Sequence, residues 1–255
     1  MTQVVQEVVA LIDRSGSMAG KEADSVGGFN STLDVLRAEM DDNTTIKVSI
    51  KLFDHEEKLL IRSLDLSKVN NLRIDQFKPR GQTALYDAMG NTLQYFVEQK
   101  LKNTNSYDSC IIYVVTDGYE SASKKYTADV LKDIIKNAEE HHNIRVIYLG
   151  ANQDAILEAS KFGINANQAM NYSESTDETN AAYRAAASVA GRFRSCGTAG
   201  FLEVERMASQ TQTVNDQGSL TNVHPYGTFS MGSAPPQVTR QNSVRIKPNK
   251  YARNS

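Results

Sequence analysis

Short apolar runs alternate along this chain with segments whose apolar residues recur every three or four positions. The runs predict buried strands, and the wider spacing predicts amphipathic helices. Strands are expected at 4–12, 45–53, 58–64, 110–115, 144–149 and 169–172, and helices at 26–40, 84–102, 128–140, 154–161 and 181–194. This alternation predicts an α/β fold: a doubly wound, mostly parallel, Rossmann-like sheet with helices on both faces.

Two local features refine this predicted fold, one in the sheet and one in a helix. Residues 45–53 alternate apolar with polar side chains, and the turn at 54–56 is short enough only for an antiparallel hairpin. Strand 58–64 therefore lies antiparallel at one edge, where lysines and glutamates protect it. Within helix 26–40, the pair Gly27-Gly28 weakens helix propensity, so we expect another element to approach closely there.

Oxygen-bearing side chains occur at three places beside the predicted strands. Asp13, Ser15 and Ser17 follow the first strand, Thr83 begins a helix, and Asp117 ends the most apolar strand. In an open parallel sheet, ligands bind beyond the carboxyl ends of the strands, where the strand order reverses. Carboxylates and hydroxyls are hard oxygen donors that suit Mg²⁺. Each segment alone could equally be a turn or a helix cap, so the prediction of a metal site rests on their combination.

With these residues in place, the chain resembles a von Willebrand factor A (VWA, or integrin inserted-type) domain over roughly residues 1–195. In that family the metal-ion-dependent adhesion site has the sequence pattern Asp-x-Ser-x-Ser, followed further along the chain by a Thr and then an Asp. All five positions are filled here, by Asp13, Ser15, Ser17, Thr83 and Asp117. The resemblance implies Mg²⁺ (or Mn²⁺) bound by the three hydroxyls, with the two carboxylates binding directly or through water.

The same resemblance implies a function in protein–protein binding. Neutral hydroxyls leave the cation able to accept a further acid, so an Asp or Glu of another protein completes its coordination. Gly16, Gly118 and Tyr119 are expected to contact this partner. In some family members a terminal helix shifts when the ligand arrives, and residues 181–194 would be that helix here.

The local sequences at 27–30, 81–85 and 150–155 are similar to those of cytoplasmic VWA proteins of bacteria and their phages. We therefore expect the protein in the cytoplasm, or in a virion assembled there. The chain begins without a basic segment, and no apolar run approaches the roughly 18 residues that span a bilayer, so no membrane association is expected. Two distant cysteines, Cys110 and Cys196, give no disulfide framework and favour a reducing compartment.

Two other functions remain open. A carboxylate such as Asp13 after a first strand also serves phosphoryl-transfer hydrolases as a nucleophile. Those enzymes usually place a second Asp where Ser15 stands, and the chain has no Gly-x-x-x-x-Gly-Lys loop. We therefore expect no enzyme, with a Mg²⁺-dependent hydrolase as the alternative. A purely structural role in an assembly is the other alternative.

Composition divides the chain into a VWA domain at 1–195, a connector at 196–208 and a tail at 209–255. The tail holds four of the five prolines and carries five basic residues against one acidic residue, whereas the whole chain has a net charge of −2. Such a polar segment is expected to be disordered unless it binds a partner, through which it could mediate homo- or hetero-assembly. Nucleic acid is an unlikely partner, since the basic residues lack aromatic stacking pairs.

Overall fold

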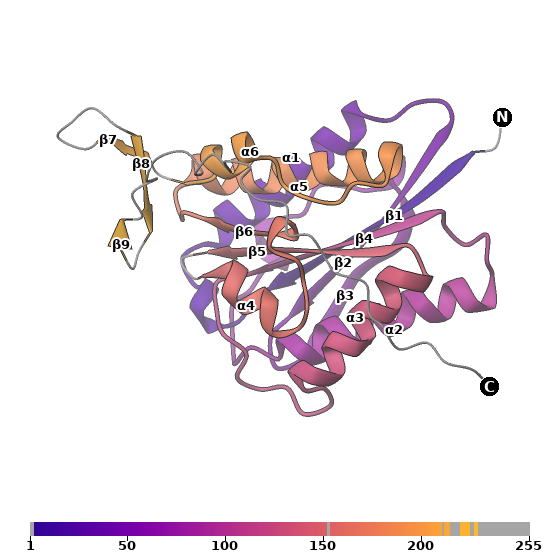
Figure 1. Ribbon diagram of the computed structural model, residues 1–255, viewed down its shortest axis with the longest axis horizontal. Coiled ribbons are helices and arrows are strands. Elements are labelled where there is room, and N and C mark those ends of the chain that lie inside the picture. The colour runs from indigo at the N-terminus through magenta and orange to yellow at the C-terminus, as the bar shows by residue number, and fades with distance from the viewer. Residues whose placement is uncertain (1–2, 152–153, 211, 215–219, 225–226, 229–255) are drawn as a thin grey trace, which may run out of the picture.

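The protein is built around a six-stranded sheet. The computed structural model describes residues 3–151, 154–210, 212–214, 220–224 and 227–228. The strands follow the order β3-β2-β1-β4-β5-β6, and every neighbouring pair is parallel except β2 with the edge strand β3 (Figure 1). Their bounds are β1 (Val4–Asp13), β2 (Thr44–Phe53), β3 (Glu57–Asp65), β4 (Ser109–Thr116), β5 (Ile144–Ala151) and β6 (Ala169–Tyr172). The predicted sheet, including its antiparallel edge, is confirmed.

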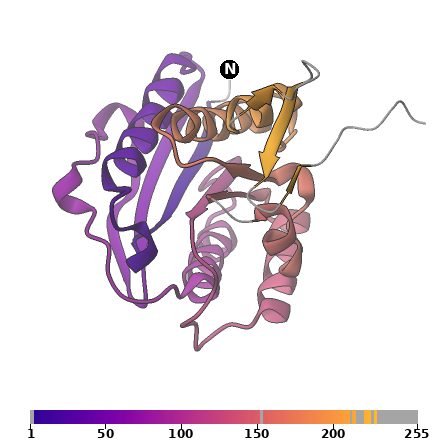
Figure 2. The same ribbon diagram turned by 90° about the vertical axis from the view of Figure 1, so that its left-hand side faces the viewer.

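Helices cover both faces of the sheet, as Figure 2 shows from the side. One face carries α1 (Glu22–Ala38), α5 (Thr176–Cys196) and α6 (Glu203–Ala208), and the other carries α2 (Leu85–Lys102), α3 (Ala128–His141) and α4 (Ala155–Lys161). Short 3-10 helices lie at η1 (Gly16–Met18), η2 (Leu66–Lys68), η3 (Ile74–Gln76) and η4 (Ala166–Gln168). Two buried apolar clusters, one on each side of the sheet, fill the spaces between the layers.

The connections explain where the two layers lie. From β1 the chain passes through α1 to β2 on one side, and from β4 it passes through α3 to β5 on the other. Because such crossovers are right-handed, opposite directions along the sheet place the connecting helices on opposite faces. Strands β1 and β4 are therefore the neighbours at which the strand order reverses, which is the place where open α/β sheets bind ligands.

Helix α5 packs against α1 at the predicted glycine pair. A Cβ built on Gly28 would lie 2.4 Å from the ring of Tyr183, so the expected close approach is confirmed there. Nothing lies within 4 Å of a Cβ built on Gly27. The helix begins five residues before the predicted 181, because Ser175 caps it and accepts a hydrogen bond from the Glu178 amide at 3.4 Å.

The predicted connector at 196–208 contains α6. The segment stays close to the sheet, because the amide of Ser173 donates to the carbonyl of the buried Ser209 at 3.0 Å. Beyond it, β7 (Gln212–Val214), β8 (Leu220–His224) and β9 (Gly227–Thr228) form a small antiparallel sheet that the sequence pattern did not predict. Most of 209–255 lies outside the described residues, so the domain division and the disordered tail stay predictions. Within the described part, no helix is both long and apolar enough to cross a membrane.

Candidate metal centre

The reversal between β1 and β4 brings Asp13 and Asp117 to one edge of the sheet. Ile12 pairs with Val115 in the strand register, so Asp13, the last residue of β1, lies beside Thr116 at the end of β4. The Thr116 hydroxyl donates to Asp13 Oδ2 at 2.6 Å, and Asp117 follows directly. Two carboxylates from strands far apart in the sequence therefore meet where ligands bind in this fold.

The backbone at Gly118 shows that all three predicted segments converge. A Cβ built on Gly118 would lie 3.2 Å from Ser17 Oγ, 3.2 Å from Thr83 Oγ1 and 3.8 Å from Asp13 Oδ2. These oxygens come from the loop after β1 and from the start of α2. A glycine at position 118 thus keeps a side chain out of the small space that the oxygens line.

Hydrogen bonds also fix the other oxygen-bearing side chains around this space. Asp13 Oδ1 accepts from the amide of Ser15 at 2.6 Å, and the hydroxyls of Ser15 and Ser17 lie 3.0 Å apart. Ser17 Oγ in turn donates to Asp117 Oδ1 at 2.6 Å. Asp13, Ser15 and Thr83 are all buried, and the Asp117 side chain is 2% exposed. These hydrogen bonds fix the positions of the oxygen-bearing side chains relative to one another.

Charges in this cluster are unevenly compensated. Burial raises the pKa of Asp13 to about 6, although hydrogen bonds from Thr116 and Ser15 lower it, and the nearby Asp117 adds to the rise. The ammonium of Lys21 contacts both Asp117 Oδ2 and Glu174 Oε1. Partial burial lowers the pKa of Lys21, but these carboxylates outweigh burial and raise it above its usual value.

The donor set fits a hard divalent cation. It offers three hydroxyls and two carboxylates, which are the ligand types that Mg²⁺ and Mn²⁺ accept. A positive charge beside Asp13 would offset the cost of burying that carboxylate in its ionised form. A raised pKa from burial is thus compatible with a cation beside Asp13.

Comparison with known proteins identifies the family. The profile of the von Willebrand factor type A domain matches residues 7–185, which is most of the chain. The chain belongs to this family. VWA domains are protein-interaction modules that often carry a divalent metal at a metal-ion-dependent adhesion site. No curated protein sequence matches the chain.

Solved structures of VWA proteins share the fold at low sequence identity. The vWF domain of the type V pili tip protein Mfa5 from Porphyromonas gingivalis is 12% identical, with a TM-score of 0.56 over 78% of this chain and 99% of that one. Proximal thread matrix protein 1 from the mussel byssus is 13% identical, with a TM-score of 0.55 over 74% of this chain and 47% of the mussel chain. The pilus adhesin SpaC from Lactobacillus rhamnosus GG is 13% identical, with a TM-score of 0.55 over 76% and 30%. This chain thus covers less than half of the mussel protein, and at such identities the likeness supports the fold alone.

The three residues predicted to contact a partner differ in their exposure and contacts around the oxygen cluster. Tyr119 is 54% exposed and stands free to contact another protein. Gly118 lines the space between the oxygens. Gly16 donates its amide to the carbonyl of Gly81 at 3.0 Å, which ties the first loop to the loop that carries Thr83. Their role in partner binding stays a prediction.

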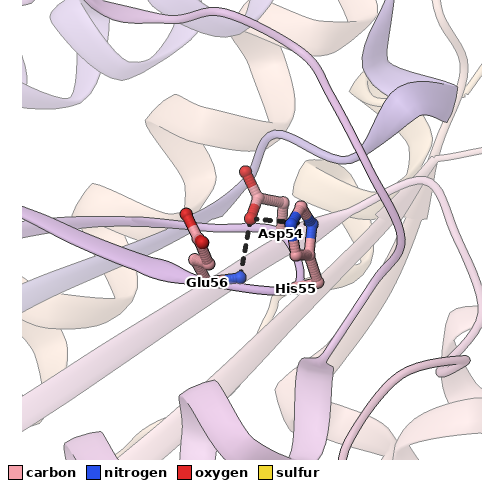
Figure 3. Close-up of side chains that lie close together, drawn as sticks. All are labelled: Asp54, His55 and Glu56. Carbon is pink, nitrogen blue, oxygen red and sulfur yellow. Dashed lines mark hydrogen bonds and ion pairs between the residues drawn. The ribbon is translucent and has the colours of Figure 1, made fainter.

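A second cluster, Asp54-His55-Glu56, lies in the hairpin turn after β2 (Figure 3). These three side chains offer possible metal-ligand atoms within 4.8 Å of one another. Asp54 Oδ2, however, is 3.0 Å from Nε of both Arg14 and Arg80, and Glu56 also pairs with Arg80. Guanidinium groups already neutralise both acids. The cluster is therefore better explained as a set of ion pairs that holds neighbouring loops together, here called the brace, than as a metal site.

This brace joins the two loops that carry the predicted ligands. Arg14 lies within the Asp-x-Ser-x-Ser loop, and Arg80 precedes Thr83 by three residues. The carbonyl of Asp54 also accepts the Ala84 amide at 2.9 Å. Gly81 has φ +68, and a Cβ there would lie 2.1 Å from Nδ1 of His55, so only glycine fits between the loops.

A polar hollow of about 530 Å³ adjoins Thr83. It is lined by His55, Gly81, Gln82, Asp87, Ser121, Ala122, Ser123 and Lys124. Its walls are ordered, because Asp87 accepts hydrogen bonds from the amides of residues 124, 125 and 126 at 2.8–3.0 Å. The hollow is therefore a polar depression with ordered walls, next to the loop that carries Thr83.

Sequence reasoning missed three contributors to this site. Thr116, Lys21 and Asp54 each contact a predicted ligand or brace its loop. Thr116 and Asp54 could have been found from strand register, since both stand at the carboxyl ends of the strands that flank β1. Nothing in the spacing of Lys21 pointed to Asp117, because that contact joins residues 96 positions apart.

Proposed function

We propose that this VWA domain binds Mg²⁺ (or Mn²⁺) and uses it to capture an acidic side chain of another protein. Asp13, Ser15, Ser17, Thr83 and Asp117 would hold the cation. Bound there, the cation supplies a positive centre for an incoming Asp or Glu carboxylate. The location expected from the sequence, cytoplasm or virion, stays a prediction.

One observation carries this proposal. The single point beside Gly118 lies within 4 Å of oxygens from Asp13, Ser17 and Thr83, which belong to two separate loops. Since the three residues lie up to 70 positions apart in the chain, their convergence is a product of the fold. Hydroxyls that only capped turns would have no reason to face a common space with a buried carboxylate.

The residues around the site would orient the partner. Tyr119 is exposed beside the cluster, and the hollow next to Thr83 carries His55, Gln82 and Lys124. These groups can hydrogen-bond the segment of the partner that follows its acid. The braced loops hold the ligands in place, so little ordering is required when the partner binds.

The contacts of Asp13 favour binding over catalysis. Both of its oxygens accept hydrogen bonds, and the residue is fully buried. A nucleophile must direct a lone pair at its substrate, whereas hydrogen bonds from Ser15 and Thr116 hold the oxygens of this carboxylate. A phosphoryl-transfer enzyme is therefore the weaker candidate, and turnover of a phosphate ester that depends on Asp13 would favour it.

The test compares the wild-type protein with Asp13→Ala and with Asp133→Ala, a matched control on the exposed surface of α3. Mg²⁺ binding is measured by isothermal titration calorimetry, and partner capture is measured by pull-down with Mg²⁺ or EDTA and mass spectrometry. We expect Mg²⁺ binding and Mg²⁺-dependent capture in the wild type and the control. Asp13→Ala should lose both while its thermal unfolding stays cooperative.

The adhesion function would be refuted if the wild-type protein captured the same proteins in EDTA as in Mg²⁺. It would also be refuted if Asp13→Ala retained full Mg²⁺ affinity. A structural role in an assembly predicts the first of these results, so the same experiment separates the two functions.

A further inference from the structure

Lys21 places a positive charge inside the predicted metal site. It is the N-cap residue of α1, four positions after Ser17, and its ammonium contacts Asp117 Oδ2. The Lys21 side chain is 27% exposed, and that of Asp117 is 2% exposed. Among the residues that the structure describes, no other lysine or arginine contacts Asp13 or Asp117.

Asp117 is fully engaged by this arrangement. Ser17 donates to Oδ1 at 2.6 Å, while Lys21 takes Oδ2. A divalent cation that uses Asp117 must share the carboxylate with the ammonium or displace it. Because like charges repel strongly where water is scarce, sharing is unfavourable.

Glu174 offers the lysine a second partner. It follows β6 and stands just before Ser175, the N-cap of α5, and its Oε1 also contacts the Lys21 ammonium. Glu174 is 35% exposed, far more than Asp117. A lysine released from Asp117 would therefore keep one ion pair in a better-hydrated position.

We propose that Lys21 is an internal counter-ion that competes with the divalent cation for Asp117, and that Glu174 holds the lysine when Asp117 turns to the cation. This inference rests on the proposed metal site and names what sets its affinity. Lys21 stabilises the metal-free protein and weakens metal binding, whereas Glu174 favours metal binding by drawing the ammonium away.

The test measures Mg²⁺ affinity by isothermal titration calorimetry on the full chain after dialysis against EDTA. We expect Lys21→Gln to bind Mg²⁺ about tenfold more tightly than the wild type, which corresponds to about 1.4 kcal/mol. Glu174→Gln should bind more weakly. Lys136→Gln removes the same charge from an exposed position of α3, and it should change affinity much less.

Two further readouts separate competition from a simple change of local charge. In the double variant Lys21→Gln/Glu174→Gln, the effect of Glu174 should shrink, because it acts through the lysine. In EDTA, Lys21→Gln should melt at a lower temperature than the wild type, and Mg²⁺ should restore it. Equal Mg²⁺ affinities for Lys21→Gln and the wild type would overturn the counter-ion alone, whereas no Mg²⁺ binding by either protein would overturn the metal site as well.

Discussion

Glu7 is a buried acid in the central strand, and its removal should stabilise the protein at neutral and basic pH. It lies on β1 between Lys47 of β2 and Cys110 of β4 in the register, and it is only 4% exposed. Its Oε2 has no hydrogen-bond partner within the described structure. Burial raises its pKa from 4.5 to about 7, and the Ser63 hydrogen bond and the charge of Lys47 only partly oppose this.

The sign and size of the effect follow from this pKa. The folded protein holds the Glu7 proton up to about pH 7, whereas the unfolded chain releases it near 4.5. Stability therefore falls as the pH rises through this window, because the folded state must accept a buried charge. The difference between the two pKa values corresponds to about 3 kcal/mol at a pH above both. Glu7→Gln cannot ionise and should escape this loss.

Urea unfolding followed by circular dichroism at pH 4 and pH 8, in EDTA, measures the effect. Glu7→Gln should match the wild type near pH 4 and exceed its free energy of unfolding by about 3 kcal/mol at pH 8. Asp13 titrates in an overlapping range, but it does so equally in both proteins. Glu140→Gln, which changes a side chain that is 53% exposed, is the control and should follow the wild type. A Glu7→Gln protein with the pH profile of the wild type would refute the reasoning.

Three shorter predictions concern the helix contact and the metal site. Gly28→Ala should cost about 1–3 kcal/mol of unfolding free energy by overpacking against Tyr183, whereas Gly27→Ala should gain up to about 1 kcal/mol of helix propensity, both by urea denaturation. Gly118→Ala should lower Mg²⁺ affinity more than about tenfold in calorimetry, since its methyl group enters the space between the donor oxygens. Mg²⁺ affinity should also fall about tenfold per pH unit below about 6, because Asp13 must lose its proton; a flat profile from pH 4.5 to 7 would contradict this.

The sheet could be predicted because the apolar pattern within each strand is visible in its own local sequence. Runs such as 110–115 are apolar throughout, and the alternation at 45–53 distinguishes a half-covered strand from a central one. The edges of elements were less predictable. The first turn of α5 is polar, so the alanine-rich pattern marked only the later turns of that helix. Met40 shares the helical spacing of α1, yet it lies beyond the end of that helix and is exposed.

The residues of the candidate site were also predictable only in part. Asp13 and Asp117 could be located because they follow strands, and strand ends meet at the reversal of strand order. Lys21 could not, since its contact with Asp117 depends on how loops far apart in the sequence fold over one another. Local patterns report what an element is, whereas charge partners are fixed by tertiary packing.

The charge balance of the site links its two proposed tasks. Two carboxylates, Asp13 and Asp117, would neutralise a divalent cation and leave little attraction for an incoming acid. The Lys21 ammonium adds a positive charge beside them, and Glu174 takes part of that charge back at a more exposed position. Once the cation is in place, the proposed pairing of Lys21 with Glu174 would offset the charge of the lysine, so Lys21 would act on metal binding more than on the attraction for a partner's carboxylate. The proposed competition for Asp117 would therefore set the metal affinity first, and would affect partner capture through the fraction of sites that hold the cation.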